Sequence, residues 1–79
     1  MPQVTILFFG SIGELFGGQR QIEIPPDCSV GDLRRILAEE HKGIAAATIR
    51  AAVGQQVAEE DTPIGPGDEV AFFSPVSGG

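Results

Sequence analysis

The distribution of apolar and polar side chains along the chain predicts five β-strands. Residues 3–9 are rich in β-branched and aromatic side chains, and residues 19–24 alternate between polar and apolar before two prolines end the pattern. The other three predicted strands are residues 49–53, the short segment 56–58 and residues 68–73. We expect the first two strands to pair as a hairpin.

The clearest helical pattern begins at Ser29, a candidate N-cap residue. Asp32 stands three residues later, at the spacing of a capping box, and places an acid in the first turn. The apolar stripe predicted to face the core is Val30, Leu33, Ile36 and Leu37, with Arg34, Arg35, Glu39 and Glu40 away from it. We expect the helix to continue through His41 and Lys42 and to end at Gly43.

A shorter helical segment of one or two turns is predicted between the first two strands. Ile12, Leu15 and Phe16 have helical spacing there, and the pair Gly17-Gly18 is a natural stop.

This order of elements predicts an α+β fold of two layers, with one amphipathic helix packed on one face of a small mixed sheet. The order matches the β-grasp, or ubiquitin-like, arrangement, in which the first and last strands lie side by side and parallel. No repeat or linker divides the chain. We therefore expect residues 1–79 to form a single domain, with residues 74–79 as an extended C-terminal tail.

The first and last strands carry apolar side chains on both faces, although a single helix can cover only one face. The side chains expected beneath the helix are Ile6, Phe8, Val70 and Phe72. Those left on the open side are Leu7, Phe9 and Phe73, with Val57 beside them. Exposed apolar patches often mark partner sites, so we predict a partner interface here. The alternative is that the short segment of residues 12–16, or a loop, folds over the patch.

The last strand leads into the tail, which runs Ser74-Pro75-Val76-Ser77-Gly78-Gly79. Fully extended, these residues would span about 20 Å. Glycine has no Cβ, so a Gly-Gly end can enter a narrow channel and present the α-carboxylate of Gly79 to a partner. We expect this carboxylate to be the functional group of the protein. Two alternatives are an inert, small-residue chain end and the remnant of an expression vector.

Composition restricts the function further. The chain has 79 residues, 42% of them hydrophobic, and a formal net charge of −6, so it lacks the basic surface that nucleic-acid binding needs. No apolar run is long enough to cross a membrane, and the start does not resemble a signal peptide. With a single cysteine, we expect a cytoplasmic protein. The surplus acid either favours a basic partner surface or only keeps the protein soluble.

Four segments together resemble the family of small, sulfur-carrying subunits of molybdopterin synthase. They are Ile-Leu-Phe-Phe-Gly at residues 6–10, Glu-Leu-Phe-Gly at 14–17, Ala-Ala-Val-Gly-Gln at 51–55, and the run from Gly67 to Gly79. The approach Asp-Glu-Val-Ala-Phe-Phe to the Gly-Gly end is the most specific part. Ser74 stands where the family usually carries proline, and Gly54 where it often carries asparagine.

The resemblance implies that an ATP-dependent, ubiquitin-activating-like enzyme adenylates the Gly79 carboxylate. Sulfur from a persulfide protein then replaces AMP and leaves a thiocarboxylate, which the large synthase subunit uses to build the dithiolene of the pterin. The chain would bind no cofactor of its own and would not be an enzyme by itself. By the same resemblance Gly78 belongs to the reacting end. The residues expected to contact the partner are Leu7, Phe9, Val57, Phe73, Ser74, Pro75, Val76 and Ser77, in an assembly of two small and two large subunits.

Three other functions stay open from the sequence. The chain could carry sulfur for thiazole synthesis, act as a ubiquitin-like modifier that joins Gly79 to lysines, or be a binding module with an inert tail.

Other residues with reactive or charged side chains favour structural roles. Cys28 lies before the predicted helix, where a redox or persulfide role would need an exposed thiol of lowered pKa, and a lone cysteine is more often a small apolar residue. His41 has no second metal ligand at suitable spacing. The acidic run 59–61 fits either a basic partner surface or a solvated loop.

Overall fold

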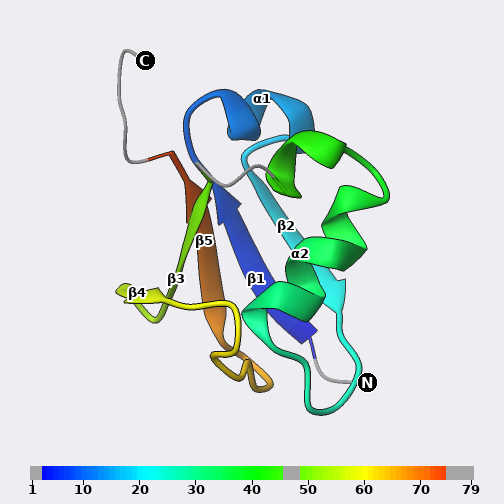
Figure 1. The fold of residues 1–79 in the computed structure, drawn as a ribbon, viewed down its shortest axis with the longest axis vertical. Coiled ribbons are helices and arrows are strands. Elements are labelled where there is room, and N and C mark those ends of the chain that lie inside the picture. Colours follow the sequence, from blue (N-terminus) through cyan, green and yellow to red (C-terminus); the bar gives the residue numbers. More distant parts are fainter. Residues whose placement is uncertain (1–2, 46–48, 75–79) are drawn as a thin grey trace.

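The structure, a computed structural model, describes residues 3–45 and 49–74. Figure 1 shows one mixed sheet with α2 packed across one of its faces. In chain order the elements are β1 (Gln3–Phe8), α1 (Ser11–Phe16), β2 (Gln19–Glu23), α2 (Val30–Ala38), the 3-10 helix η1 (Lys42–Ala45), β3 (Arg50–Val53), β4 (Gln56–Ala58) and β5 (Glu69–Phe73).

The five strands lie in the order β2-β1-β5-β3-β4. β1 and β5 are parallel neighbours at the centre, and the β1–β2, β3–β5 and β3–β4 pairs are antiparallel. The parallel first and last strands, the hairpin and the single main helix confirm the predicted β-grasp fold. Because β5 is central, its C-terminal end lies within the sheet, between β1 and β3, and the tail leaves from there.

The core lies between the sheet and α2. Ile6, Phe8, Val70 and Phe72 point toward the helix and are at most 4% exposed, as predicted. α1 belongs to the same side, because the Phe16 ring stacks on Phe8 with the ring centroids 4.5 Å apart and Ile12 is buried. Ile12 and Phe16 therefore do not cover the open side of the sheet, and the alternative in which this segment covers it is wrong.

The predicted capping box is confirmed at the start of α2. The Ser29 side chain accepts the backbone N–H of Asp32, and the Asp32 carboxylate accepts the backbone N–H of Ser29. The Asp32 carboxylate also pairs with Arg35. This reciprocal bonding satisfies two backbone donors that the first turn would otherwise leave free.

The C-terminal half of the predicted helix needs three corrections. α2 ends at Ala38, so Gly43 is not its C′ residue and instead lies inside η1, which turns Ile44 into the core. Ile36 is 40% exposed and does not belong to the buried stripe. Arg34 takes its place toward the sheet, since a residue four positions after Val30 lies on the same side of a helix.

Candidate functional site

The face of the sheet away from α2 carries a continuous apolar row. Strand register places Leu7 beside Ala71, Ala71 beside Ala52, and Ala52 beside Val57. This row crosses four adjacent strands, so residues distant in the sequence form one surface. We call this surface, together with Phe73 two residues along β5, the open face.

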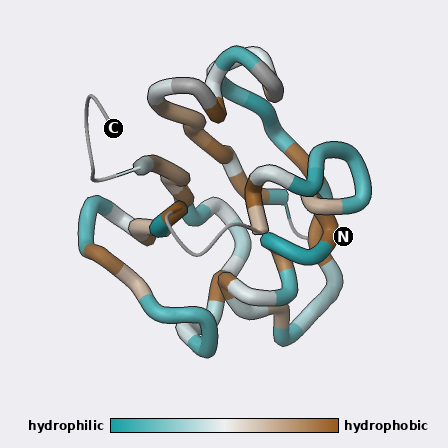
Figure 2. Tube along the Cα trace, turned by 45° about the horizontal axis from the view of Figure 1, so that its top comes forward, coloured by the Kyte–Doolittle hydropathy of each residue, from teal (hydrophilic) through white to brown (hydrophobic). Residues whose placement is uncertain are grey.

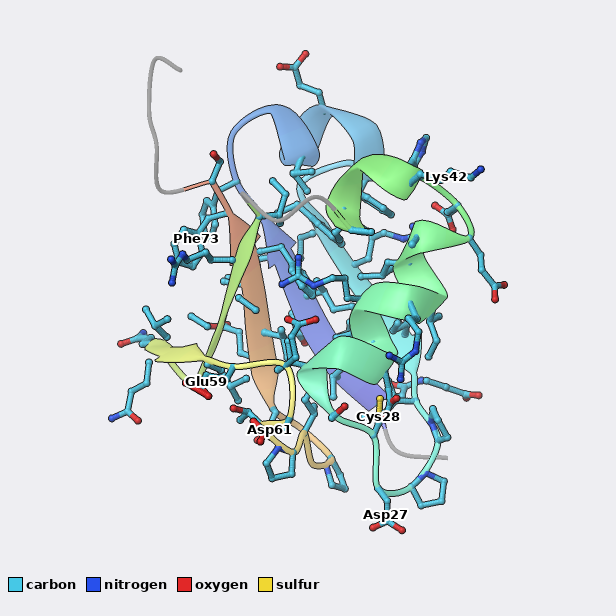
Figure 3. The ribbon with its side chains drawn as sticks, viewed as in Figure 1. Asp27, Cys28, Lys42, Glu59, Asp61 and Phe73 are labelled. Atoms are coloured by element: carbon cyan, nitrogen blue, oxygen red, sulfur yellow. The ribbon has the colours of Figure 1, made fainter. Side chains whose placement is uncertain are left out.

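The apolar side chains of this surface remain accessible. Val57 is 67% exposed and Phe9, immediately after β1, is 52% exposed, while Leu7 and Phe73 are half-buried. Figure 3 shows Phe73 on the side of β5 that faces away from α2. The prediction that these side chains are left uncovered is confirmed for Phe9 and Val57, and holds only in part for Leu7 and Phe73. In a small protein an apolar cluster of this kind is typical of a partner-binding surface.

The backbone fixes Phe9 at the end of the parallel strand pair. Its N–H donates to the carbonyl oxygen of Phe72 at 3.0 Å, so the β1–β5 ladder continues one residue beyond the end of β1. Figure 2 shows that the chain is hydrophobic along the end of β5. Two aromatic side chains, Phe9 and Phe73, therefore mark the point where the sheet gives way to the tail.

Polar side chains surround the apolar row. Gln21 on β2 donates from its Nε2 to Thr5 Oγ1 at 3.4 Å, and Glu69 stands in register with Thr5 on the other side. Arg50, the first residue of β3, stands in register with Phe73 and is exposed. An apolar centre with a polar rim is the usual composition of a protein–protein interface.

The tail begins beside this surface. Ser74 follows β5 directly and is exposed. The other residues predicted to act with it, Pro75, Val76, Ser77, Gly78 and Gly79, lie outside the described residues. The described part of the chain thus supplies an accessible apolar surface at the root of the predicted reactive end.

Cys28 does not have the properties of a reactive thiol. It is 1% exposed, and burial, followed by the nearby Asp32 carboxylate, raises the pKa of its thiol. Figure 3 places it at the start of α2, where its Sγ lies 3.5 Å from the carbonyl oxygen of Ser29. A buried thiol of raised pKa is a poor nucleophile, so the structural interpretation of Cys28 holds.

Two of the remaining candidates, His41 and Glu60, also make structural contacts. His41 packs edge-to-face on the Phe16 ring at 5.0 Å between centroids. Glu60, from the acidic run, forms an ion pair with Arg34 at 2.9 Å, whereas no described partner pairs with Glu59 or Asp61. Within residues 3–45 and 49–74, no three His, Cys, Asp or Glu side chains gather as metal ligands, and no helix is long and apolar enough to cross a membrane.

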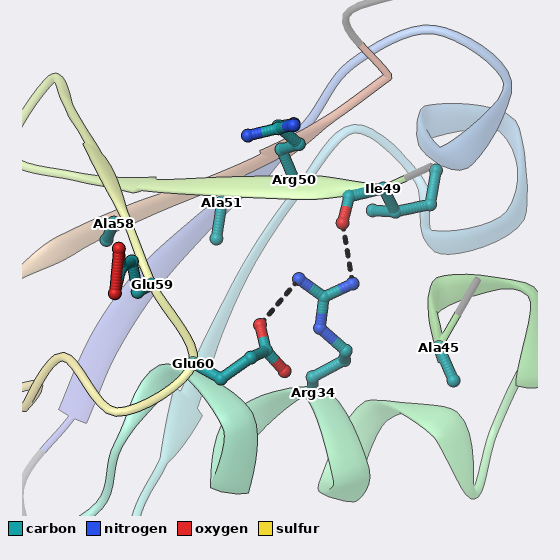
Figure 4. A pocket seen from close by; sticks show the side chains of 8 residues that line it. All are labelled: Arg34, Ala45, Ile49, Arg50, Ala51, Ala58, Glu59 and Glu60. Atoms are coloured by element: carbon teal, nitrogen blue, oxygen red, sulfur yellow. Dashed lines mark hydrogen bonds and ion pairs between the residues drawn. The ribbon is translucent and has the colours of Figure 1, made fainter. Parts of the chain in front are cut away.

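One functional-looking feature was not predicted. A hollow of about 270 Å³ opens between α2 and β3, lined by Arg34, Ala45, Ile49, Arg50, Ala51, Ala58, Glu59 and Glu60. Figure 4 shows Arg34 filling its floor, bonded to Ile49 and Glu60. The Arg34 guanidinium is hydrogen-bonded within the chain, so we interpret the hollow as a structural contact between α2 and β3. The only sequence signal for it was the position of Arg34 four residues after Val30.

Comparison with known proteins finds a matching family and relatives that are similar over the whole chain. Residues 6–79 match the ThiS family. The chain is 38% identical over 81 residues to the molybdopterin synthase sulfur carrier subunit of Escherichia coli (strain K12), covering 96% of this chain and 99% of that protein. It is 31% identical over 83 residues to the protein of the same name from Mycobacterium tuberculosis (strain ATCC 25618 / H37Rv), with both chains fully covered.

Solved structures share the fold at lower identity. A putative molybdopterin converting factor subunit 1 from Pyrococcus furiosus superposes with a TM-score of 0.85 at 24% identity, covering 96% of this chain and 100% of that one. The small archaeal modifier protein 1 of Haloferax volcanii gives 0.81 at 21% identity, with 96% and 100% covered. A chain from the complex of subunits 1 and 2 of the Helicobacter pylori molybdopterin-converting factor gives 0.70 at 24% identity, with 98% and 99% covered.

Proposed function

The chain belongs to the ThiS family, and from this membership we propose that it is the sulfur carrier subunit of a molybdopterin synthase. The observation that carries the proposal is the end-to-end likeness to the Escherichia coli carrier, in a chain whose uncovered apolar surface leads into a Gly-Gly tail. The family match runs through residue 79, so the proposed site of sulfur attachment is the Gly79 carboxylate.

The proposed chemistry converts an unreactive carboxylate into a sulfur donor. An adenylating enzyme transfers AMP from ATP to the Gly79 carboxylate and releases pyrophosphate, which gives an acyl group with a good leaving group. The terminal sulfur of a persulfide attacks this acyl carbon and AMP leaves. A second thiol then attacks the donor's cysteine sulfur in the resulting acyl disulfide. The transferred sulfur remains on Gly79 as a thiocarboxylate, and the donor cysteine leaves as a disulfide with the second thiol.

The chain's own contribution is access and positioning. Glycine at residues 78 and 79 offers no Cβ to obstruct a narrow active site, and the strand β5 fixes the point from which the tail departs. Holding a reacting group at a fixed point converts an encounter into an intramolecular step. In this proposal the acid, base and positioning groups come from the partners, and the chain is a cosubstrate, not an enzyme by itself.

We propose that the open face and Phe9 bind the large synthase subunit. The Helicobacter pylori neighbour is named as a complex of subunits 1 and 2 of the molybdopterin-converting factor, which supports such a pairing. An apolar centre of Leu7, Ala52 and Val57 with a polar rim fits a stable interface. The adenylating enzyme and a persulfide protein complete the set of proposed partners.

A second candidate function is protein modification. It is favoured by the fold shared with the small archaeal modifier protein 1 of Haloferax volcanii. A modifier would pass its activated Gly79 to a lysine amine in place of sulfur, so the two functions share the adenylate and differ in the acceptor.

The intact mass of the protein tests the proposal. After incubation with ATP, its adenylating enzyme and a persulfide donor, we expect a mass increase equal to sulfur replacing one oxygen, located in the C-terminal peptide. The Gly79 deletion variant must not show it. Conjugates to lysine without a mass change of the free protein would favour the modifier. No change, under conditions that charge a known carrier, would overturn both.

A further inference from the structure

Arg50 occupies a distinctive position at the root of the tail. It begins β3 and stands in register with Phe73, one residue before Ser74. Cross-strand neighbours in an antiparallel pair have Cβ atoms about 5 Å apart, so the stem of Arg50 lies beside the Phe73 ring on the open face. Arg50 also borders the hollow, and Figure 4 shows its guanidinium on the opposite side of β3 from Arg34.

Arg50 is also isolated electrostatically. The other three arginines form ion pairs, Arg20 with Glu40, Arg34 with Glu60 and Arg35 with Asp32. No ion pair joins Arg50 to any residue that the structure describes, although the chain carries eleven acids against five bases. An exposed cation with no ion-pair partner among the described residues therefore lies where the apolar surface meets the tail.

Covering this surface has a consequence for the guanidinium. A partner that packs on Phe73 removes water from the neighbouring Arg50, and a buried charge without a partner is strongly destabilising. A carboxylate is the acceptor that best matches the guanidinium, because it takes two parallel N–H bonds. A partner lacking such a group would meet an uncompensated cation at the rim of the contact, beside Phe73.

We propose that Arg50 pairs with an aspartate or glutamate side chain of the partner that receives the tail. The inference rests on the proposed function, since it assumes that the open face binds the large synthase subunit. It adds a specificity-determining residue to an otherwise apolar contact. Apolar packing supplies most of the affinity, and the ion pair fixes the orientation in which the tail enters the partner.

The test measures binding of the purified large synthase subunit from the same organism to variants of the full chain. Isothermal titration gives the Kd for wild type, Arg50→Gln and Arg50→Glu. We expect Arg50→Gln to weaken binding roughly tenfold and Arg50→Glu more, because reversal adds repulsion to the lost pair. Raising the salt concentration should reduce this loss of affinity if the ion pair is exposed to solvent, and should change it little if the pair is buried.

Lys42 provides the matched control. It is exposed, has no ion pair with a described residue, and lies on the α2 side of the molecule, away from Phe73 (Figure 3). Lys42→Gln and Lys42→Glu make the same charge changes, and we expect Kd to change less than twofold. Equal effects at Arg50 and Lys42, or none at Arg50, would overturn the inference while leaving the proposed function intact. Failure of the wild type to bind would overturn the proposed function itself.

Discussion

The guanidinium of Arg34 donates a 2.7 Å hydrogen bond to the carbonyl oxygen of Ile49, which joins α2 to the residue before β3. The same guanidinium donates to the carbonyl oxygen of Ile44 at 2.9 Å and lies 5.5 Å from the centre of the Phe72 ring. Its side chain is only 12% exposed. One arginine therefore donates to backbone acceptors in two separate segments, η1 and the residue before β3.

Replacing Arg34 by methionine should destabilise the protein by about 2–4 kcal/mol, because two carbonyl oxygens lose charge-assisted hydrogen bonds in a largely buried site. Urea unfolding measures the change. Glu60→Gln is the control. Its carboxylate is 60% exposed, so loss of its pair with Arg34 should cost less than about 1 kcal/mol. Similar costs for both variants would show that the ion pair, and not the backbone contacts, is the stabilising part.

The hairpin between β3 and β4 contains a turn residue, Gln55, whose replacement should stabilise the protein. Gly54 and Gln55 have φ angles of 58° and 72°, the left-handed conformation at both central residues that a tight hairpin turn of type I′ requires. Glutamine adopts it at a cost that glycine avoids. Gln55→Gly should therefore raise the free energy of unfolding by about 0.5–1 kcal/mol. The same replacement at Gln56, inside β4, should lower it, and a loss at Gln55 would contradict this explanation of the turn.

Local patterns in the sequence were sufficient for the faces of the central strands. Alternation in β1 and β5 separated Ile6 and Phe72, which are buried, from Phe9, which is exposed. The end of α2 was beyond such reasoning. Gly43 is a plausible helix stop, but the chain leaves the helix earlier because η1 must bring Ile44 into the core, and that requirement comes from tertiary packing.

The candidate site was predictable to a similar extent. Periodicity identified the apolar residues of the open side, because the face on which each residue lies follows from the alternation within its own strand. Arg50 was missed because a charged residue at a strand start is ordinarily solvent-exposed and does not by itself indicate a function. Its significance depends on its register with Phe73, and pairing between β3 and β5 joins segments about twenty residues apart in the sequence, which no local pattern determines.

Stability should fall in acid through the capping box. The pKa of Asp32 lies below its ordinary value, chiefly because the carboxylate accepts the backbone N–H of Ser29 and then through its side-chain bond to Ser29, with a further contribution from Arg35. A folded-state pKa below the unfolded one gives a stabilisation that is complete above the ordinary pKa of 3.8 and is lost as pH falls through the folded value.

Comparison of wild type with Asp32→Asn tests this dependence. The difference in unfolding free energy should be constant at neutral pH and should shrink below about pH 4, because protonation removes in the wild type the charge that the variant already lacks. Urea unfolding across this pH range measures it. A difference that stays constant into strong acid would show that the charge of Asp32 does not contribute.

The Cys28 thiol should be protected in the folded protein. It is 1% exposed and the pKa of its thiol is raised by burial, so reaction with a disulfide reagent requires opening of the structure. We expect labelling to be at least about a hundredfold slower than in urea-unfolded protein. The control is Cys28→Ala combined with Ser74→Cys, which places the only thiol at an exposed position. Fast labelling of native Cys28 would reopen a redox or persulfide role for it.

The open face and Phe9 should be needed for binding and dispensable for folding. Phe9 and Val57 are 52% and 67% exposed, so Phe9→Ser and Val57→Ser should leave the free energy of unfolding within about 0.5 kcal/mol of wild type. Each should weaken binding of the large synthase subunit about tenfold or more, since apolar anchors at the centre of an interface carry most of its energy. Ile36→Ser is the matched control, because Ile36 is 40% exposed but lies on α2, across the sheet from this surface. If Ile36→Ser weakened binding as much as the other two variants, the partner would have to contact the helix side of the molecule, and the tail would have to reach it from β5 around the edge of the sheet.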